Sequence, residues 1–386
     1  MMIKPVHILR LLTLMLLFAC EERYNPAIDP AVQEVLVVDG QVDNRPGPYT
    51  VKLSMTSQLS KPAFYPVLGY RVVISDDHGN SETLSEVREG IYRTSPGGIQ
   101  GVAGRKYKVS ITSPQGKHYE SVPEVLRAPA GIDTVYHRLE HHSVDYFPYS
   151  VAGYRFFVST EKAPADSTFF LWKLIDTWKY AADFNVYWVF DGSLRRVYDS
   201  DSLKICYNTD TIQDIFGIST AGFDEPIVND YPLHWVSTET RKLQYRYSLL
   251  TQQYSVSREA FIFWNDLKEI NQSMGELYSR IPYQIRGNIR NTQNPDEVAL
   301  GYFLVAGISE KRIFADRPKP PVMLDFPKCE LIEWMYLDFR LITEAPEEDW
   351  PVFGTRGPDG NALPSQWCMD CRESGGVLEK PDFWIE

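Results

Sequence analysis

The chain has 386 residues, of which 44% are hydrophobic and 13% aromatic, with 39 basic against 51 acidic side chains. A net charge of −12 argues against nucleic acid as a partner, because an acidic surface repels the phosphate backbone. The length exceeds what one hydrophobic core usually organises, so two or more domains are expected.

The first element along the chain is an export signal. Lys4 and Arg10 accompany an apolar run that ends in a small residue directly before Cys20. A basic start, a short apolar stretch and a small residue at the cut describe a secretory signal. We therefore expect a lipoprotein signal peptide over residues 1–19, with Cys20 lipidated and residues 20–33 acting as a tether. The alternative is an ordinary secreted protein with a chance Cys at the cut.

Removal of this signal would make the chain more acidic. It takes away two basic residues and leaves 37 basic against 51 acidic ones, a net charge of −14. Outside the signal we find neither a basic amphipathic segment nor a second apolar run of the roughly 20 residues that span a bilayer. Covalent lipid, rather than surface charge, is therefore the expected attachment to a membrane.

Short strands punctuated by turn residues follow the tether. Residues 35–40 form an apolar strand, residues 49–54 alternate between apolar and polar, and the turn at 76–80 contains Gly79, which can take positive φ. Strand and turn signals every 8–12 residues predict a β-sandwich of immunoglobulin or transthyretin type over residues 34–128.

A larger β-rich domain is expected over residues 129–386. One segment in it departs from the alternation of strands, because apolar residues recur at helical spacing from Phe261 onward. Ser257 is a plausible N-cap and Gly275 a plausible stop, so we expect one substantial helix near 257–274. The fold class is therefore mainly β, with a sandwich followed by a larger β domain that contains this helix.

Four cysteines remain after Cys20, namely Cys206, Cys329, Cys368 and Cys371. An exported chain favours two disulfides, which sequence leaves open among three connectivities. A zinc site on the C-x-x-C pair is the alternative, although the second half of the usual four-ligand pattern is missing. Free or mixed thiols are a further alternative, and a redox pair lacks the strand-to-helix context of such sites.

Motifs for catalysis are missing from the sequence. We find no G-x-S-x-G, no H-E-x-x-H and no phosphate-binding loop, so no catalytic residue is expected. The acidic stretch 183–230 lacks the spacing of a calcium loop, which leaves calcium open but unsupported, and no other metal or cofactor is expected. Pro346 and Pro351 accompany a cluster of carboxylates and predict an exposed acidic loop with Glu344, Glu347, Glu348 and Asp349.

Aromatic residues suggest a contact surface. The candidates are Trp178, Tyr180, Tyr187 and Trp188, together with the loop 146–149. Exposed Tyr and Trp supply contact area at low entropic cost.

Several short motifs occur in a characteristic order along the chain. They are Cys20-Glu21-Glu22, Leu36-Val37-Val38-Asp39-Gly40, Gly47-Pro48-Tyr49-Thr50, Gly90-Ile91-Tyr92, Gly104-Arg105-Lys106-Tyr107, Gly287-Asn288-Ile289, Gly301-Tyr302-Phe303 and Cys368-Met369-Asp370-Cys371. In this order they resemble the DUF4249 family of Bacteroidota lipoproteins, which is defined by sequence and has no settled biochemical role. The resemblance implies an outer-membrane lipoprotein, often encoded near a TonB-dependent receptor, and it brings no catalytic residues. Glu21 and Glu22 look like the acidic signal that directs such lipoproteins to the cell exterior.

Together these features predict a lipid-anchored, non-enzymatic binding or assembly module beside a TonB-dependent receptor or another outer-membrane β-barrel complex. A surface lipoprotein that binds a glycan or peptide and delivers it to a receptor is the second hypothesis. A hydrolase with an unrecognised site is the third.

Overall fold

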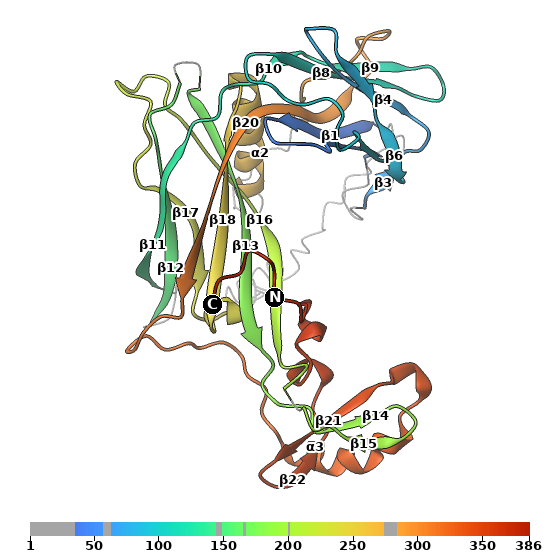
Figure 1. The fold of residues 1–386 in the computed structure, drawn as a ribbon, viewed down its shortest axis with the longest axis vertical. Helices are drawn as coiled ribbons and strands as arrows, with labels where there is room; N and C mark the ends of the chain where they lie inside the picture. The colour runs from blue at the N-terminus through green and yellow to red at the C-terminus, as the bar shows by residue number, and fades with distance from the viewer. Residues whose placement is uncertain (1–34, 57–62, 144–148, 165–166, 200, 274–283) are drawn as a thin grey trace, which may run out of the picture. The chain divides into compact units, whose positions relative to one another are not determined.

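The computed structural model describes residues 35–56, 63–143, 149–164, 167–199, 201–273 and 284–386 (Figure 1). Cys20, Glu21, Glu22, Gly275 and residues 146–148 therefore lie outside the described residues. Leu36–Glu386 forms one compact unit, and the prediction of a mainly β protein with one substantial helix is confirmed. No helix in the described ranges is long and apolar enough to cross a membrane.

The N-terminal strands form a sandwich of two sheets. Val38, Leu53, Ile74 and Val109 alternate with more exposed neighbours along their strands and meet in a fully buried core. One sheet has the order β1 (Leu36–Asp43), β2 (Thr50–Met55), β7 (Ile91–Arg93), β6 (Ser85–Arg88), with β3 (Tyr65–Pro66) beside β2. The other has the order β19 (Ile289–Asn291), β9 (His118–Ser121), β8 (Lys106–Thr112), β4 (Arg71–Asp76), β5 (Ser81–Thr83), with β10 (Glu124–Val125) beside β8.

One long strand, β20 (Ala299–Asp316), joins this sandwich to the rest of the molecule. Its first half pairs in parallel with β1, from Leu36 opposite Ala299 to Asp43 opposite Ala306. Its second half pairs antiparallel with β18 (Arg246–Ser255). The first sheet therefore continues as β16-β13-β18-β20-β1-β2-β7-β6, and the segments 34–128 and 129–386 share it (Figure 1).

The later part of this shared sheet is covered on both faces. One face packs against a three-stranded sheet of β11 (Ile132–Ser143), β12 (Ser150–Thr160) and β17 (Tyr231–Ser237), where Phe156 and Val158 meet Leu174 and Leu249. The other face packs against α2 (Arg258–Ser273). Its remaining strands are β13 (Phe169–Ala181) and β16 (Ile205–Ser219).

The predicted helix is confirmed as α2. The amide of Ala260 donates a hydrogen bond of 3.0 Å to Ser257 Oγ, as expected of an N-cap. Ala260 and Phe263 are buried against Leu171, Tyr254 and Leu304 of the sheet. The aromatic stripe of this helix is therefore part of the core.

Two separate stretches form a further unit that we call the C-terminal module, residues 184–203 and 328–375. Its sheet has the order β15 (Leu194–Arg196), β14 (Trp188–Phe190), β21 (Val352–Gly357), β22 (Gly360–Ala362). Its helices are α3 (Glu333–Asp338) and the short η3 (Phe339–Glu344), η4 (Glu347–Asp349), η5 (Gln366–Cys368) and η6 (Cys371–Ser374). The short η2 (Arg241–Leu243) precedes β18.

The last residues return to the shared sheet. Val377 forms a β-bridge with Tyr207 at the outer edge of β16. The Trp384 ring is only 4% exposed and meets the rings of Tyr207 and Phe314 edge-on. The tail is thus held against the sheet.

Candidate functional site

A pocket of about 470 Å³ lies on the α2 side of the shared sheet, and we call it the central groove. Residues of β1, β13, β16, β18, β20 and α2 line it, so strands from both predicted domains build one hollow. Tyr254, Tyr302 and Leu304 give it a largely apolar floor, and Trp264 of α2 also lines it. A pocket of this size with apolar walls and a few polar groups is typical of a ligand site.

A β-bulge helps to open the groove. Trp172 lies opposite Phe216, whereas Leu174 lies opposite Ile212, so residues 213–215 of β16 face Lys173 alone. Residues 213–215 line the groove together with Lys173. Bulges bend a strand and redirect its side chains, and they are common beside functional sites.

The groove has a charged rim. Asp39, Lys173 and Asp214 are exposed and line it. Asp39 lies 3.5 Å from Lys52 in a solvent-exposed ion pair, which holds it only weakly. The Trp264 indole Nε1 is buried and has no hydrogen-bond partner among the described residues. The rim therefore offers charges of both signs to a ligand.

A second hollow of about 430 Å³ continues along β1 and shares Asp39, Gly40, Gln41 and Lys173 with the groove. Arg45 closes it with a 2.8 Å ion pair to Asp43 and a second pair to Glu310. Between the two hollows, burial raises the pKa of Tyr254 to about 12, so this hydroxyl stays protonated.

A buried carboxylate supports the groove floor. Tyr302 and Asn288 donate to one oxygen of Glu124, and Ser257 donates to the other at 3.1 Å. Burial raises the pKa of Glu124, although these three donors act in the opposite direction. Because both oxygens are engaged, Glu124 fixes the orientation of the Tyr302 ring.

The predicted aromatic surface does not exist as one patch. Tyr180 is only 3% exposed, which corrects its assignment as a contact residue. Trp178 is half-buried beneath Lys242, whose Nζ lies 4.3 Å from the ring centroid. Tyr187 and Trp188 are half-buried in the C-terminal module. Strand alternation placed Trp178 and Tyr180 on one face but could not reveal what covers that face.

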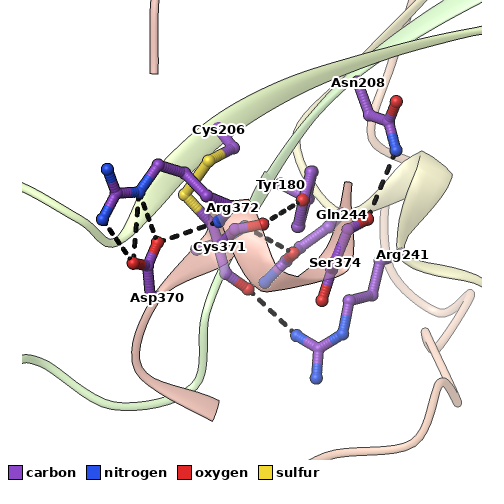
Figure 2. Close-up of a disulfide and its surroundings, with 10 residues drawn as sticks. Tyr180, Cys206, Asn208, Arg241, Gln244, Asp370, Cys371, Arg372 and Ser374 are labelled. Carbon is purple, nitrogen blue, oxygen red and sulfur yellow. Dashed lines mark hydrogen bonds and ion pairs between the residues drawn. A yellow bond between two sulfur atoms is a disulfide. The ribbon is translucent and has the colours of Figure 1, made fainter. Parts of the chain in front are cut away.

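The cover is the segment that carries the last two cysteines. Cys206 is bonded to Cys371, and Cys329 to Cys368, which is one of the three connectivities left open by the sequence. Figure 2 shows the Tyr180 hydroxyl donating to the Cys371 carbonyl next to the first bridge. Since Cys368 and Cys371 belong to different bridges, they form neither a redox pair with each other nor half of a zinc site. No group of three or more metal-binding side chains is found in the described part of the chain.

A family model, described as a domain of unknown function, DUF4249, matches residues 21–312. The chain belongs to the DUF4249 family. The match covers β1 to most of β20, whereas Cys329, Cys368 and Cys371 lie beyond its end. A search of curated proteins finds no relative of this DUF4249 chain.

Motifs that suggested DUF4249 membership converge beside the groove. A Cβ on Gly301 would lie 2.0 Å from the Val38 carbonyl oxygen, and one on Gly287 would lie 1.5 Å from the Gly301 carbonyl oxygen. Asn288 exchanges two hydrogen bonds of 2.9 Å with the backbone of Phe303. These residues fix the position where β1, β19 and β20 meet and where Tyr302 enters the floor.

Sequence reasoning missed the groove of this DUF4249 protein. Asp39 gave a signal, because a carboxylate interrupts an otherwise apolar strand. Lys173 and Trp264 gave none, since each occupies a position that also suits an ordinary surface or core residue. The pairing of β1 with β20 brings Asp39 to the hollow that Lys173 and Trp264 also line.

Proposed function

We propose that this protein is a lipid-anchored, non-enzymatic binding or assembly module of the outer membrane. Cys20 would carry the lipid, and Glu21 and Glu22 would direct the protein to the cell exterior. The module would act beside a TonB-dependent receptor or another β-barrel complex. The observation that carries the proposal is the central groove, a preformed hollow with an apolar floor and a charged rim.

The framework around the groove favours binding to a rigid surface. β1, β13, β18 and β20 are central strands of one sheet, and Tyr302 is fixed through the buried Glu124. Binding to a preformed site avoids the entropic cost of ordering it. A carboxylate with both oxygens engaged by donors also suits a structural role better than proton transfer.

Isolation of complexes from membranes tests this proposal. We expect tagged full-length protein, extracted with a mild detergent, to retain an outer-membrane barrel protein. Lys173→Glu should weaken this association. The control Lys162→Glu should not, because Lys162 is exposed and does not line the groove. Recovery of the wild type as a lone monomer would count against the proposal.

A second candidate function is the capture of a glycan or peptide for delivery to a receptor. The aromatic residues Tyr254, Trp264 and Tyr302 in the groove lining favour it, because aromatic rings supply contact area to such ligands. Binding assays with polysaccharides and peptides would distinguish the two functions, since an assembly module should show no ligand preference. Trp264→Ala, which removes an aromatic ring from the groove lining, should weaken ligand binding if the second function is correct.

A further inference from the structure

The helical segment from α3 to η3 carries apolar side chains on two sides. Phe339 and Ile342 face the sheet of the C-terminal module. Ile342 is 2% exposed, and Phe339 lies against the Trp188 ring. Trp334, Leu337 and Leu341 are instead 50%, 51% and 51% exposed. A side of a helix that carries large apolar side chains is normally packed against another surface.

The three exposed residues form a continuous stripe, which we call the outer stripe. Trp334 and Leu337 are three residues apart on α3, and Leu341 follows four residues later in η3, which continues α3 through helical backbone angles at Asp338 and Phe339. This spacing keeps the three side chains toward one side of the helical segment. Contiguous apolar side chains at a surface mark interaction sites, whereas scattered ones need no explanation. A tryptophan among them is the residue type that most often dominates binding energy at such sites.

Negative charge surrounds the outer stripe. Residues 330–349 contain seven carboxylates and a single basic residue, Arg340. None of the seven forms an ion pair with any residue in the described part of the chain. Glu333 and Glu344 lie on the same helical segment as the stripe and are exposed. The surface is therefore apolar at its centre and acidic around it.

The outer stripe stands on a fixed base. The Cys329–Cys368 disulfide begins four residues before α3, and the Leu363 amide donates to the Met335 carbonyl at 2.9 Å. A Cβ on Gly357 would lie 2.4 Å from the Tyr336 hydroxyl, so α3 packs closely on β21. A surface held in this way loses little conformational entropy when a partner binds.

We propose that the outer stripe docks a segment of a partner protein that presents apolar side chains flanked by Lys and Arg. The inference rests on the proposed role as a module that contacts another protein, and it gives the chemistry of that contact. Complementary charge would steer the partner to the acidic rim, and the apolar centre would hold it.

Charge also argues against two other occupants. A second copy packed through the same face would bring two sets of seven carboxylates together, because a two-fold contact is formed by the same patch on both molecules. Anionic lipid would meet the same repulsion. A basic protein segment is the occupant whose charge fits.

The test uses purified full-length protein with Cys20→Ser and a fluorescent amphipathic peptide in which Leu and Lys follow helical spacing. We expect Leu337→Ser with Leu341→Ser to weaken peptide binding at least tenfold without altering net charge. The control Leu68→Ser removes a leucine that is 54% exposed in the N-terminal sandwich and should leave the affinity unchanged. A matched Leu and Glu peptide should bind at least tenfold more weakly than the Leu and Lys peptide, and added salt should reduce binding of the latter.

Equal affinity of the double variant and the Leu68→Ser control would overturn the inference. So would loss, in the double variant only, of self-association or of binding to vesicles containing phosphatidylglycerol, because the occupant would then be a second copy or lipid. Circular dichroism of both variants checks that they fold. Failure here leaves the proposed function standing if membrane complexes still form, whereas loss of those complexes with intact peptide binding would overturn the proposed function alone.

Discussion

Val38 and Gly301 lie opposite each other in the parallel pair of β1 and β20, and the backbone at Gly301 leaves no space for a side chain. Gly301 has φ of +88°, and a Cβ there would lie 2.0 Å from the Val38 carbonyl oxygen. The contact joins the first strand of the sandwich to the strand that crosses the molecule. Gly301 also directly precedes Tyr302, whose hydroxyl is held by Glu124 at the groove floor.

Gly301→Ala should therefore be strongly destabilising. Positive φ costs an L-residue about 1–2 kcal/mol, and the clash with backbone adds to this, so we expect a loss of about 3 kcal/mol in the free energy of unfolding. Urea unfolding measures it. Gly79→Ala is the matched control, because Gly79 has φ of +89° but nothing within 4 Å of a Cβ, and it should lose only about 1 kcal/mol. Equal losses at both positions would contradict the close contact with Val38.

The two disulfides predict a thiol count and an order of stabilities. Denatured Cys20→Ser protein should react with a thiol reagent at no site before reduction and at four sites after it. Cys206–Cys371 closes 165 residues and Cys329–Cys368 closes 39. In the chain-entropy model, removal of the longer bridge should cost about 1 kcal/mol more than removal of the shorter one. Free thiols without reductant would contradict this pairing.

The buried Glu124 should make stability fall as the pH rises. Its folded pKa lies above the unfolded value of about 4.3, so the folded state binds the extra proton, and this contribution is lost as the pH rises through the folded pKa. Glu124→Gln cannot ionise and should gain stability relative to wild type between pH 4.5 and pH 8. Urea unfolding at both pH values tests this.

Glu124→Ala is the control for the comparison of wild type with Glu124→Gln. Glu124→Ala removes the acceptor of the Tyr302 and Ser257 hydroxyls and should lose about 3 kcal/mol or more at both pH values. A constant difference between wild type and Glu124→Gln across this range would show that Glu124 is not buried as described.

Asp76 should have the opposite effect on the pH dependence of stability, because its contribution is lost as the pH falls. Burial would raise its pKa, but bonds from Asn80, His78 and Arg105 outweigh this and lower the pKa to about 2. Its stabilisation is present above the unfolded value of about 3.9 and is lost as the pH falls toward 2.

Asp76→Asn should accordingly destabilise the fold by about 1–2 kcal/mol at pH 7, after allowance for solvent screening, and by less at pH 3. The free energy of unfolding at both pH values measures the change. The Asp39 side chain is 71% exposed, so Asp39→Asn should change the free energy of unfolding by less than about 0.5 kcal/mol. An Asp76 effect that does not shrink at low pH would be inconsistent with the lowered pKa.

Local patterns in the sequence were sufficient to predict the strands and the helix. An apolar run identified the strand at residues 35–40 and alternation identified the one at 49–54, and the Ser257 cap located the start of α2. Such signals depend on neighbours within a few residues, which the sequence displays directly.

The pairing of strands and cysteines far apart in sequence could not be predicted from these local patterns. Nothing near Val38 indicates that its partner lies at Gly301, and four cysteines do not reveal their connectivity. Tyr180 illustrates the consequence, because nothing near it in sequence indicates that the Cys371 segment covers it. The groove is missed for the same reason, since its walls come from strands far apart in sequence.

The central claim, a lipid-anchored module that works in an outer-membrane complex, is tested most directly by its recovery from membranes. Tagged wild type and Cys20→Ser should be compared after membrane fractionation and extraction with mild detergent. We predict that the wild type fractionates with the outer membrane and retains a β-barrel partner, and that Cys20→Ser loses both. A wild type recovered as a lone monomer, or a Cys20→Ser protein that stays with the membrane, would contradict the account.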